Sequence, residues 1–173
     1  VKGLLKSSIR DNNPVIFLEY KAQYNMKGEV PTDPEFVIPL GKGEIKKEGK
    51  DVTIITWSRQ VNFSLEAAAK LKEEGIDVEV LDLRTLVPLD FDMIKESVSK
   101  THNVVIVEED VKRLGFGAEI SAQIMEDLFD ELDSPVLRVA GANVVSPFSP
   151  SLEDAVFPQV DDIVAGVKKA LNK

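Results

Sequence analysis

Strand-like and helix-like patterns alternate along most of this chain. The stretch from Asp82 to Asp90 follows an apolar run at 76–81 and opens a helical pattern at 91–99. The run 104–107 is again apolar and β-branched, and a glycine-containing turn at 115–117 opens the next helical pattern. Parallel neighbouring strands need a crossover, usually a helix. The alternation therefore predicts an α/β fold with a three-layer, doubly wound, mostly parallel sheet.

This alternation sets the expected elements of one domain, from residue 35 to residue 173. A segment rich in glycine and charge at 41–49 is expected to be an exposed hairpin or loop. The expected strands are 36–38, 52–57, 78–81, 104–107 and 135–139, and the expected helices are 60–74, 90–99, 117–132, 152–157 and 160–171. The expected core residues are Ile54, Ile55, Val80, Leu81, Val105, Ile106, Val136 and Leu137.

Residues 1–34 differ from this domain. The first ten residues can form a short amphipathic helix, and the apolar run 15–18 is short enough to be a buried strand. Residues 19–34 hold two prolines and one glycine in a polar stretch, which is typical of a linker. Since so few residues cannot form a core alone, 1–34 are expected to be the tail of a preceding domain plus a linker. The start at Val1 suggests a trimmed or excised fragment.

Charge and composition exclude several classes of function. The chain has no cysteine, so disulfides and thiolate metal sites are excluded. The net charge of −9 is uneven: residues 1–50 carry nine basic and seven acidic side chains, whereas residues 51–173 carry twelve and twenty-three. An acidic domain repels phosphate backbones, so we expect a basic protein partner and no nucleic acid. No apolar run approaches the roughly 20 residues that span a bilayer, so no membrane partner is expected.

The single histidine, His102, directly precedes the strand expected at 104–107. It therefore falls at the amino ends of the strands, whereas ligands in open α/β sheets bind outside the carboxyl ends. We expect a surface residue at this position. A Ser-His-Asp hydrolase site would depend on this one ring, so the sequence disfavours a hydrolase.

Two carboxylates, Glu108 and Glu109, end the same strand at its carboxyl edge. Paired carboxylates in that place could act as acid and base. The structural alternative is that Glu108 caps a helix N-terminus or pairs with a cation. The candidate cations are Lys112, Arg113 and Arg84.

Gly115 and Gly117 follow these carboxylates. A dinucleotide-binding fingerprint needs a third glycine, which is missing. Close packing of a helix on a strand explains the two glycines, and an anion bound at the helix N-terminus is the alternative. Asp82 and Arg84, at the end of the preceding strand, are expected to form an ion pair or to order their loop. No spacing of histidine, aspartate and glutamate indicates a metal site.

Acidic side chains gather toward the end of the helix expected at 117–132. Negative charge near a helix C-terminus opposes the helix dipole, so we expect an outside use for these carboxylates. We interpret Asp130, Glu131 and Asp133 as a partner-binding patch. A merely solvated acidic face is the alternative.

Several motifs in a fixed order resemble one enzyme family. They resemble the C-terminal domain of the transketolase-like enzymes, and most of all the beta chain of the thiamin-dependent 2-oxo acid dehydrogenases of pyruvate or branched-chain type. At Gly141-Ala142-Asn143 the chain departs from the Pro-Asp pair that many relatives carry. The motifs are Pro14–Glu19, Gly28–Pro31, Ile38–Lys42, Val52–Trp57, Asp82–Asp90, Val107–Glu109, Gly115–Ile120 and Pro135–Val139.

The resemblance implies a role in decarboxylation of a 2-oxo acid on thiamin diphosphate and magnesium, with transfer of the acyl group to a lipoyl arm. In such enzymes the cofactor lies between an alpha chain and the pyrimidine-binding domain of the beta chain. The glutamate that activates the aminopyrimidine is therefore expected upstream of Val1. By this resemblance, no catalytic, cofactor-binding or metal-binding residue is expected within the chain.

The same resemblance implies partners and a compartment. The expected partners are the alpha subunit, a second beta subunit and the small, basic subunit-binding domain of the acyltransferase. The expected location is the cytoplasm, or the mitochondrial matrix in a eukaryote. Two alternatives stay open: an independent flavodoxin-like module that binds an anion or nucleotide between Glu109 and Gly117, and the C-terminal domain of another thiamin enzyme, such as a deoxyxylulose-phosphate synthase or an acetoin dehydrogenase.

Overall fold

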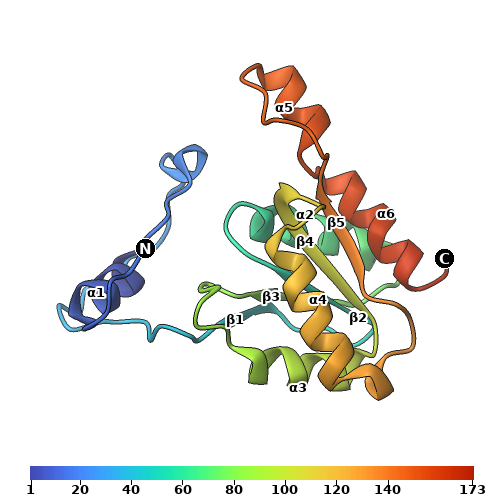
Figure 1. Cartoon of the computed structure of the whole chain (residues 1–173), viewed down its shortest axis with the longest axis horizontal. Coiled ribbons are helices and arrows are strands. Elements are labelled where there is room, and N and C mark those ends of the chain that lie inside the picture. Colours follow the sequence, from blue (N-terminus) through green and yellow to red (C-terminus); the bar gives the residue numbers. More distant parts are fainter.

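The computed structural model describes all 173 residues and contains one five-stranded sheet (Figure 1). Its strands are β1 (Glu44–Lys47), β2 (Val52–Thr56), β3 (Val78–Asp82), β4 (Val104–Val111) and β5 (Leu137–Gly141). Their order across the sheet is β1-β3-β2-β4-β5. The last four strands in the sequence are parallel, and only β1 is antiparallel to its neighbour β3. The predicted α/β class and mostly parallel sheet are confirmed.

Helices cover both faces of the sheet (Figure 1). One face is covered by α2 (Gln60–Glu73) and α6 (Val160–Ala170), and the other by α3 (Phe91–Thr101) and α4 (Phe116–Asp127). The predicted three layers follow from this arrangement. The short helix α5 (Pro150–Val156) stands beyond the carboxyl ends of the strands, at the top of Figure 1. None of the helices has the length and apolar character needed to cross a membrane.

The core divides into two apolar clusters, one on each face of the sheet. Because both faces are covered, every residue of β2 is buried, which explains its continuous β-branched sequence. Val136 and Leu137, at the start of the edge strand β5, are only half-buried and pack against the margins of the two clusters, so they are peripheral rather than central core residues. The other six expected core residues are fully buried: Ile54, Ile55, Val80, Leu81, Val105 and Ile106.

The polar junction at 82–90 joins β3, the segment before β1, and α3. The buried Asp90 precedes the first residue of α3, and its carboxylate accepts hydrogen bonds from the Gly43 N–H at 3.0 Å and from the Lys42 ammonium at 3.2 Å. Burial alone would raise the pKa of Asp90, but the Gly43 N–H and Lys42 outweigh it and hold that pKa below its usual value. The junction is thus a structural clamp.

The first strand does not lie where the sequence pattern placed it. Residues 36–38 form no strand, and β1 lies inside the segment 41–49 that was expected to be an exposed hairpin or loop. An edge strand needs only one paired side and tolerates charge, so its composition resembles that of a loop. Ile45 pairs opposite Leu81 of β3, and Lys47 anchors the strand by donating to the Val78 carbonyl at 2.7 Å.

Residues 1–40 lie mostly apart from the sheet (Figure 1). Helix α1 (Lys2–Arg10) is confirmed, and it packs on residues 33–38: the Ser7 hydroxyl donates to the Ile38 carbonyl at 2.5 Å, and the Lys2 ammonium donates to the Asp33 carbonyl at 3.1 Å. The run 15–18, expected to be a buried strand, has no strand partner, and Ile16 and Leu18 are each 87% exposed. The prediction of a buried strand at 15–18 is wrong: the sheet ends at β1 on one side and at β5 on the other, and neither strand pairs with the run.

Truncation of Ile106 to alanine should reduce the free energy of unfolding by roughly 2–5 kcal/mol, because the side chain is fully buried between β4 and the helices on its face. Denaturant titration measures this loss. Ile9→Ala, at an exposed position of α1, is the control and should change stability by less than about 0.5 kcal/mol. A loss below about 0.5 kcal/mol for Ile106→Ala would contradict its central place in the core.

Candidate functional site

The order of the strands marks a natural place for a ligand. From β2 the chain passes to β3 on one side, whereas β4 lies on the other side of β2 and leads on to β5. In open α/β sheets, ligands bind outside the carboxyl ends of the strands where the order reverses. Arg59 follows β2 at this point, and Glu108 and Glu109 lie in the last half of β4.

Glu108 is bound by two other elements. Its side chain is fully buried, with 0% exposure. One carboxylate oxygen accepts the N–H of Gly117 in the first turn of α4 at 2.8 Å, and the other accepts from Arg138 of β5 at 2.5 Å. The predicted helix cap is therefore confirmed, but the paired cation is Arg138, not Lys112, Arg113 or Arg84. A charged residue between the apolar neighbours of the edge strand β5 was the available sequence signal for Arg138.

The position of Glu108 also explains the glycine at 117. A β-carbon on Gly117 would lie 2.6 Å from Glu108 Oε1 and 2.9 Å from a methyl group of Ile106. Close packing of helix on strand, as expected, thus requires glycine here. A carboxylate already occupies the N-terminus of α4, and its negative charge disfavours the alternative of a bound phosphate or other anion.

Glu109 takes part in a second cluster with Arg59 and Tyr20. The Tyr20 hydroxyl donates to Glu109 at 3.0 Å, and Arg59 donates to that hydroxyl at 3.0 Å and to Glu109 at 3.2 Å. Burial raises the pKa of the Tyr20 phenol, and the Glu109 charge adds to the rise while Arg59 opposes it. Burial also works against the charge of Arg59, but its two partners outweigh burial and raise the pKa of the guanidinium. Neither Tyr20 nor Arg59 was singled out by the sequence.

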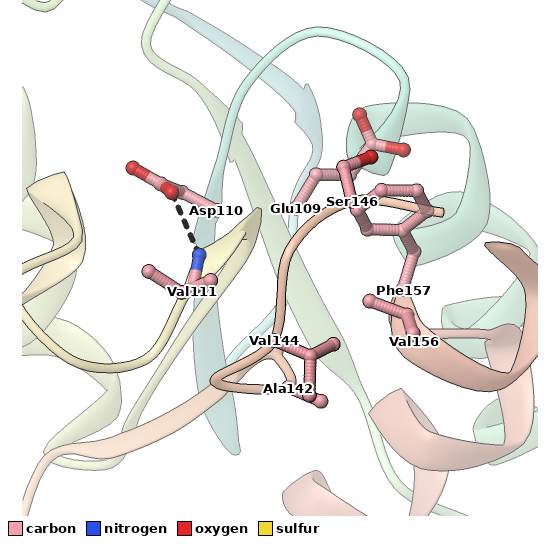
Figure 2. A pocket seen from close by; sticks show the side chains of 8 residues that line it. All are labelled: Glu109, Asp110, Val111, Ala142, Val144, Ser146, Val156 and Phe157. Atoms are coloured by element: carbon pink, nitrogen blue, oxygen red, sulfur yellow. Dashed lines mark hydrogen bonds between the residues drawn. The ribbon is translucent and has the colours of Figure 1, made fainter. Parts of the chain in front are cut away.

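A hollow of about 350 Å³ lies beside Glu109, between the end of β4, the loop after β5 and the end of α5 (Figure 2). Its charged groups are both acidic, Glu109 and Asp110, and its lining carries no basic side chain. Asp110 also accepts the N–H of Val111 at 2.7 Å. The remaining lining residues are Val111, Ala142, Val144, Ser146, Val156 and Phe157.

Asp82 and Arg84 order the loop after β3, as expected. The Arg84 N–H donates to the Asp82 carboxylate at 3.0 Å, and the Arg84 side chain pairs with Glu44 of β1. Burial raises the pKa of Asp82, and the contact with Arg84 only partly offsets this rise. The ion pair thus links the loop to the edge strand rather than to Asp82 itself.

The proposed partner-binding patch lies at the opposite, amino edge of the strands. Helix α4 ends at Asp127, short of the expected 132, and a turn of 3-10 helix, η2 (Phe129–Glu131), follows. Asp130, Glu131 and Asp133 are exposed there, as is Phe129.

His102 holds this turn in place. It ends α3 with a left-handed backbone, its carbonyl accepts the Asp133 N–H at 2.8 Å, and its ring Nδ1 lies 2.8 Å from the Glu131 carbonyl. The ring is less than half exposed. His102 thus lies at the surface on the amino edge, as predicted, and the structure adds its contact with the acidic turn.

No three histidine, aspartate or glutamate side chains come together in an arrangement that could hold a metal ion. The carboxylates at the carboxyl edge are instead divided between two structural clusters, one around Glu108 and one around Glu109. At the carboxyl edge the polar groups of Glu108 and Glu109 are thus bound by side chains and backbone of the chain itself, and the hollow beside Glu109 stays open.

Comparison with known protein families and curated sequences gives a consistent result. The family described as "Transketolase, C-terminal domain" matches residues 41–163. The pyruvate dehydrogenase E1 component subunit beta of Porphyra purpurea is 52% identical over 171 residues, which cover 99% of this chain and 51% of that protein. The mitochondrial counterpart of Caenorhabditis elegans is 48% identical over 175 residues, which cover 99% of this chain and 50% of that protein.

A relative with another function and a solved structure complete the comparison. The beta subunit of the Bacillus subtilis acetoin:2,6-dichlorophenolindophenol oxidoreductase is 49% identical over 164 residues, covering 95% of this chain and 48% of that protein. A solved split-gene transketolase, described as an inactive beta4 tetramer, superposes with a TM-score of 0.69 and 34% identity. The match covers 81% of this chain and 44% of the transketolase chain. The chain spans about half the length of the curated relatives it matches.

Replacement of Glu108 by glutamine should reduce the free energy of unfolding by roughly 3–5 kcal/mol, because it leaves the nearly buried Arg138 without a charged partner. Denaturant titration at neutral pH measures the loss. Glu74→Gln removes a half-exposed pair with Lys168 and is the matched control, with an expected cost below about 1 kcal/mol. Equal effects of the two substitutions would show that the Glu108 pair has no special structural role.

Proposed function

Since this chain belongs to the transketolase C-terminal domain family, we propose that it forms the C-terminal domain of the beta subunit of a thiamin-dependent 2-oxo acid dehydrogenase of the pyruvate type. The observation that carries this proposal is the match of almost the whole chain to pyruvate dehydrogenase beta subunits. The domain serves assembly rather than chemistry. The internal occupation of its carboxyl edge by Glu108 and Tyr20 supports this role.

The complete enzyme would use thiamin diphosphate and magnesium, but the residues of this chain do not fit that cofactor. They offer no carboxylate cluster for the metal ion. The N-terminus of α4, where a diphosphate could bind, is already capped by Glu108. We therefore assign both the cofactor and the catalytic glutamate to other parts of the enzyme.

We further propose a division of the chain at residue 34. Residues 1–34 would belong to the end of a pyrimidine-binding domain and its linker, and residues 35–173 to the C-terminal domain. In support, α1 lies apart from the sheet, and the family match begins at residue 41. The complete enzyme would work in the cytoplasm, or in the mitochondrial matrix if its source is a eukaryote.

The proposed partners are an alpha subunit, a second beta subunit and the subunit-binding domain of an acyltransferase. The beta4 tetramer described for the split-gene transketolase supports pairing of beta chains. For the acyltransferase we propose docking on Asp130, Glu131 and Asp133. Their exposure, and the excess of acidic over basic side chains in residues 51–173, support binding of a basic domain.

A second candidate is the beta subunit of an acetoin dehydrogenase, which the match to the Bacillus subtilis protein favours. Both candidates place the same domain in a thiamin enzyme and differ in substrate. An independent flavodoxin-like module is less well supported, because its anion site would coincide with the Glu108 carboxylate at the start of α4.

The chain alone should show no 2-oxo acid decarboxylase activity, since it lacks a site for the cofactor. The measurement is release of CO2 from pyruvate and from branched-chain 2-oxo acids with thiamin diphosphate and magnesium present. A denatured sample gives the background. Turnover above that background, lost on substitution of a residue of this chain, would refute the assembly role.

Neutralising the patch should slow capture of the acyltransferase subunit-binding domain. The triple variant Asp130→Asn, Glu131→Gln, Asp133→Asn should lower the association rate and flatten its dependence on salt. The reason is that attraction between opposite charges mainly raises the rate at which the two proteins meet. Stopped-flow binding at two salt concentrations measures both.

The matched control removes three exposed carboxylates elsewhere: Glu66→Gln and Glu73→Gln on α2, and Asp154→Asn on α5. It changes the net charge equally but leaves the patch intact. If both triple variants give the same rates and salt slopes, the patch is only a solvated acidic face.

A further inference from the structure

The N-terminal part of the chain is attached to the sheet domain at very few points. Three hydrogen bonds join residues 1–34 to residues 50–173. Two of them are made by the Tyr20 hydroxyl, and the third is a 3.8 Å contact from the Asn62 amide to the sulfur of Met26. No ion pair crosses between the two parts. Tyr20 is therefore the main polar attachment of the linker to the domain.

We infer that the Arg59–Glu109 pair at the carboxyl ends of β2 and β4 is an internal binding site for a tyrosine side chain, and that Tyr20 fastens residues 19–26 to it as a strap. The strap covers the place where folds of this type bind their ligands. This inference goes beyond the proposed function and does not depend on which enzyme the chain belongs to.

The Arg59–Glu109 pair matches the chemistry of a tyrosine side chain. Glu109 accepts a hydrogen bond and Arg59 donates one. A phenol hydroxyl can donate to the first and accept from the second at the same time. The Arg59 guanidinium also lies 5.8 Å from the centre of the Tyr20 ring and 4.6 Å from that of Phe63. This cation-π geometry selects an aromatic side chain as well as a hydroxyl.

The electrostatics favour the same arrangement. Glu109 and Arg59 are each only about one-fifth exposed, at 21% and 23%. Hydrogen bonds to charged groups in such a partly desolvated place are stronger than those between neutral groups. Removal of the hydroxyl alone therefore weakens the strap and leaves the Arg59–Glu109 pair in place.

The strap also has a matched internal control. Tyr24 lies in the same segment, and its hydroxyl donates to Glu19 at 2.8 Å. It is 63% exposed, and its hydroxyl makes no hydrogen bond to the sheet domain. A hydroxyl deletion at Tyr24 thus removes the same group from the same segment without touching the contacts of Tyr20 with Glu109 and Arg59.

The test is limited trypsin digestion of the full chain, with cleavage after Lys21 and Lys27 followed separately from cleavage after Lys95 in α3. Tyr20→Phe should speed cleavage at Lys21 within the strap and at Lys27 directly after it by about tenfold or more, and leave Lys95 unchanged. Tyr24→Phe should change none of the three sites. Glu109→Gln should reduce the effect of Tyr20→Phe, because the two side chains act as one unit.

Equal cleavage of the strap in the wild type, Tyr20→Phe and Tyr24→Phe would overturn the inference. If Tyr20→Phe also exposes Lys95, the substitution has loosened the whole fold. In that case the single variant Glu109→Gln tests the strap, since it keeps the Tyr20 ring but weakens the hydrogen bond between Tyr20 and residue 109. Faster cleavage at the strap than at Lys95 in that variant supports the strap, and parallel changes at all sites overturn it.

Discussion

A single buried carboxylate controls how the carboxyl half of this fold is assembled. A charge without exposure must be compensated, and Glu108 obtains a cation from β5 and a backbone N–H from α4. These two contacts fix where α4 begins and how closely it approaches β4. They also require that residue 117 has no side chain and that the edge strand carries an arginine among its apolar neighbours. Removal of any one partner would leave another buried polar group unsatisfied.

The same interaction bears on what the domain can do. Folds with this strand order commonly bind ligands at the carboxyl edge, with a helix N-terminus facing an anion. Here the glutamate Glu108 takes the place of the anion, and Tyr20 of the linker binds the neighbouring Arg59–Glu109 pair. The exposed surfaces include the acidic turn at the amino edge and the segments around α5. These features are the basis for our proposal that the domain contributes through its contacts with other chains.

The sequence patterns predicted the regular elements well because the buried strands and amphipathic helices have distinct periods. They failed for β1, whose glycine and lysine content is that of a loop but whose backbone pairs with β3. They also extended α4 too far, since the apolar spacing continues through Leu128 and Leu132 although the helix has ended. The clusters around Glu108 and Glu109 join residues far apart in the chain. The local pattern therefore indicated a partner for Glu108 but could not identify Arg138, and it gave no sign that Arg59 and Tyr20 bind Glu109.

The exposed apolar run at 15–18 has a consequence for the behaviour of the chain in solution. An extended segment of valine, isoleucine, phenylalanine and leucine, with its backbone groups unpaired, is a template for adding a strand to the edge of a sheet. The β1 edge is protected by its lysines, whereas β5 offers mostly apolar residues along its open side. Pairing of the run from one molecule with β5 of another gives the chain a route to concentration-dependent aggregation, which a charged substitution within the run would close.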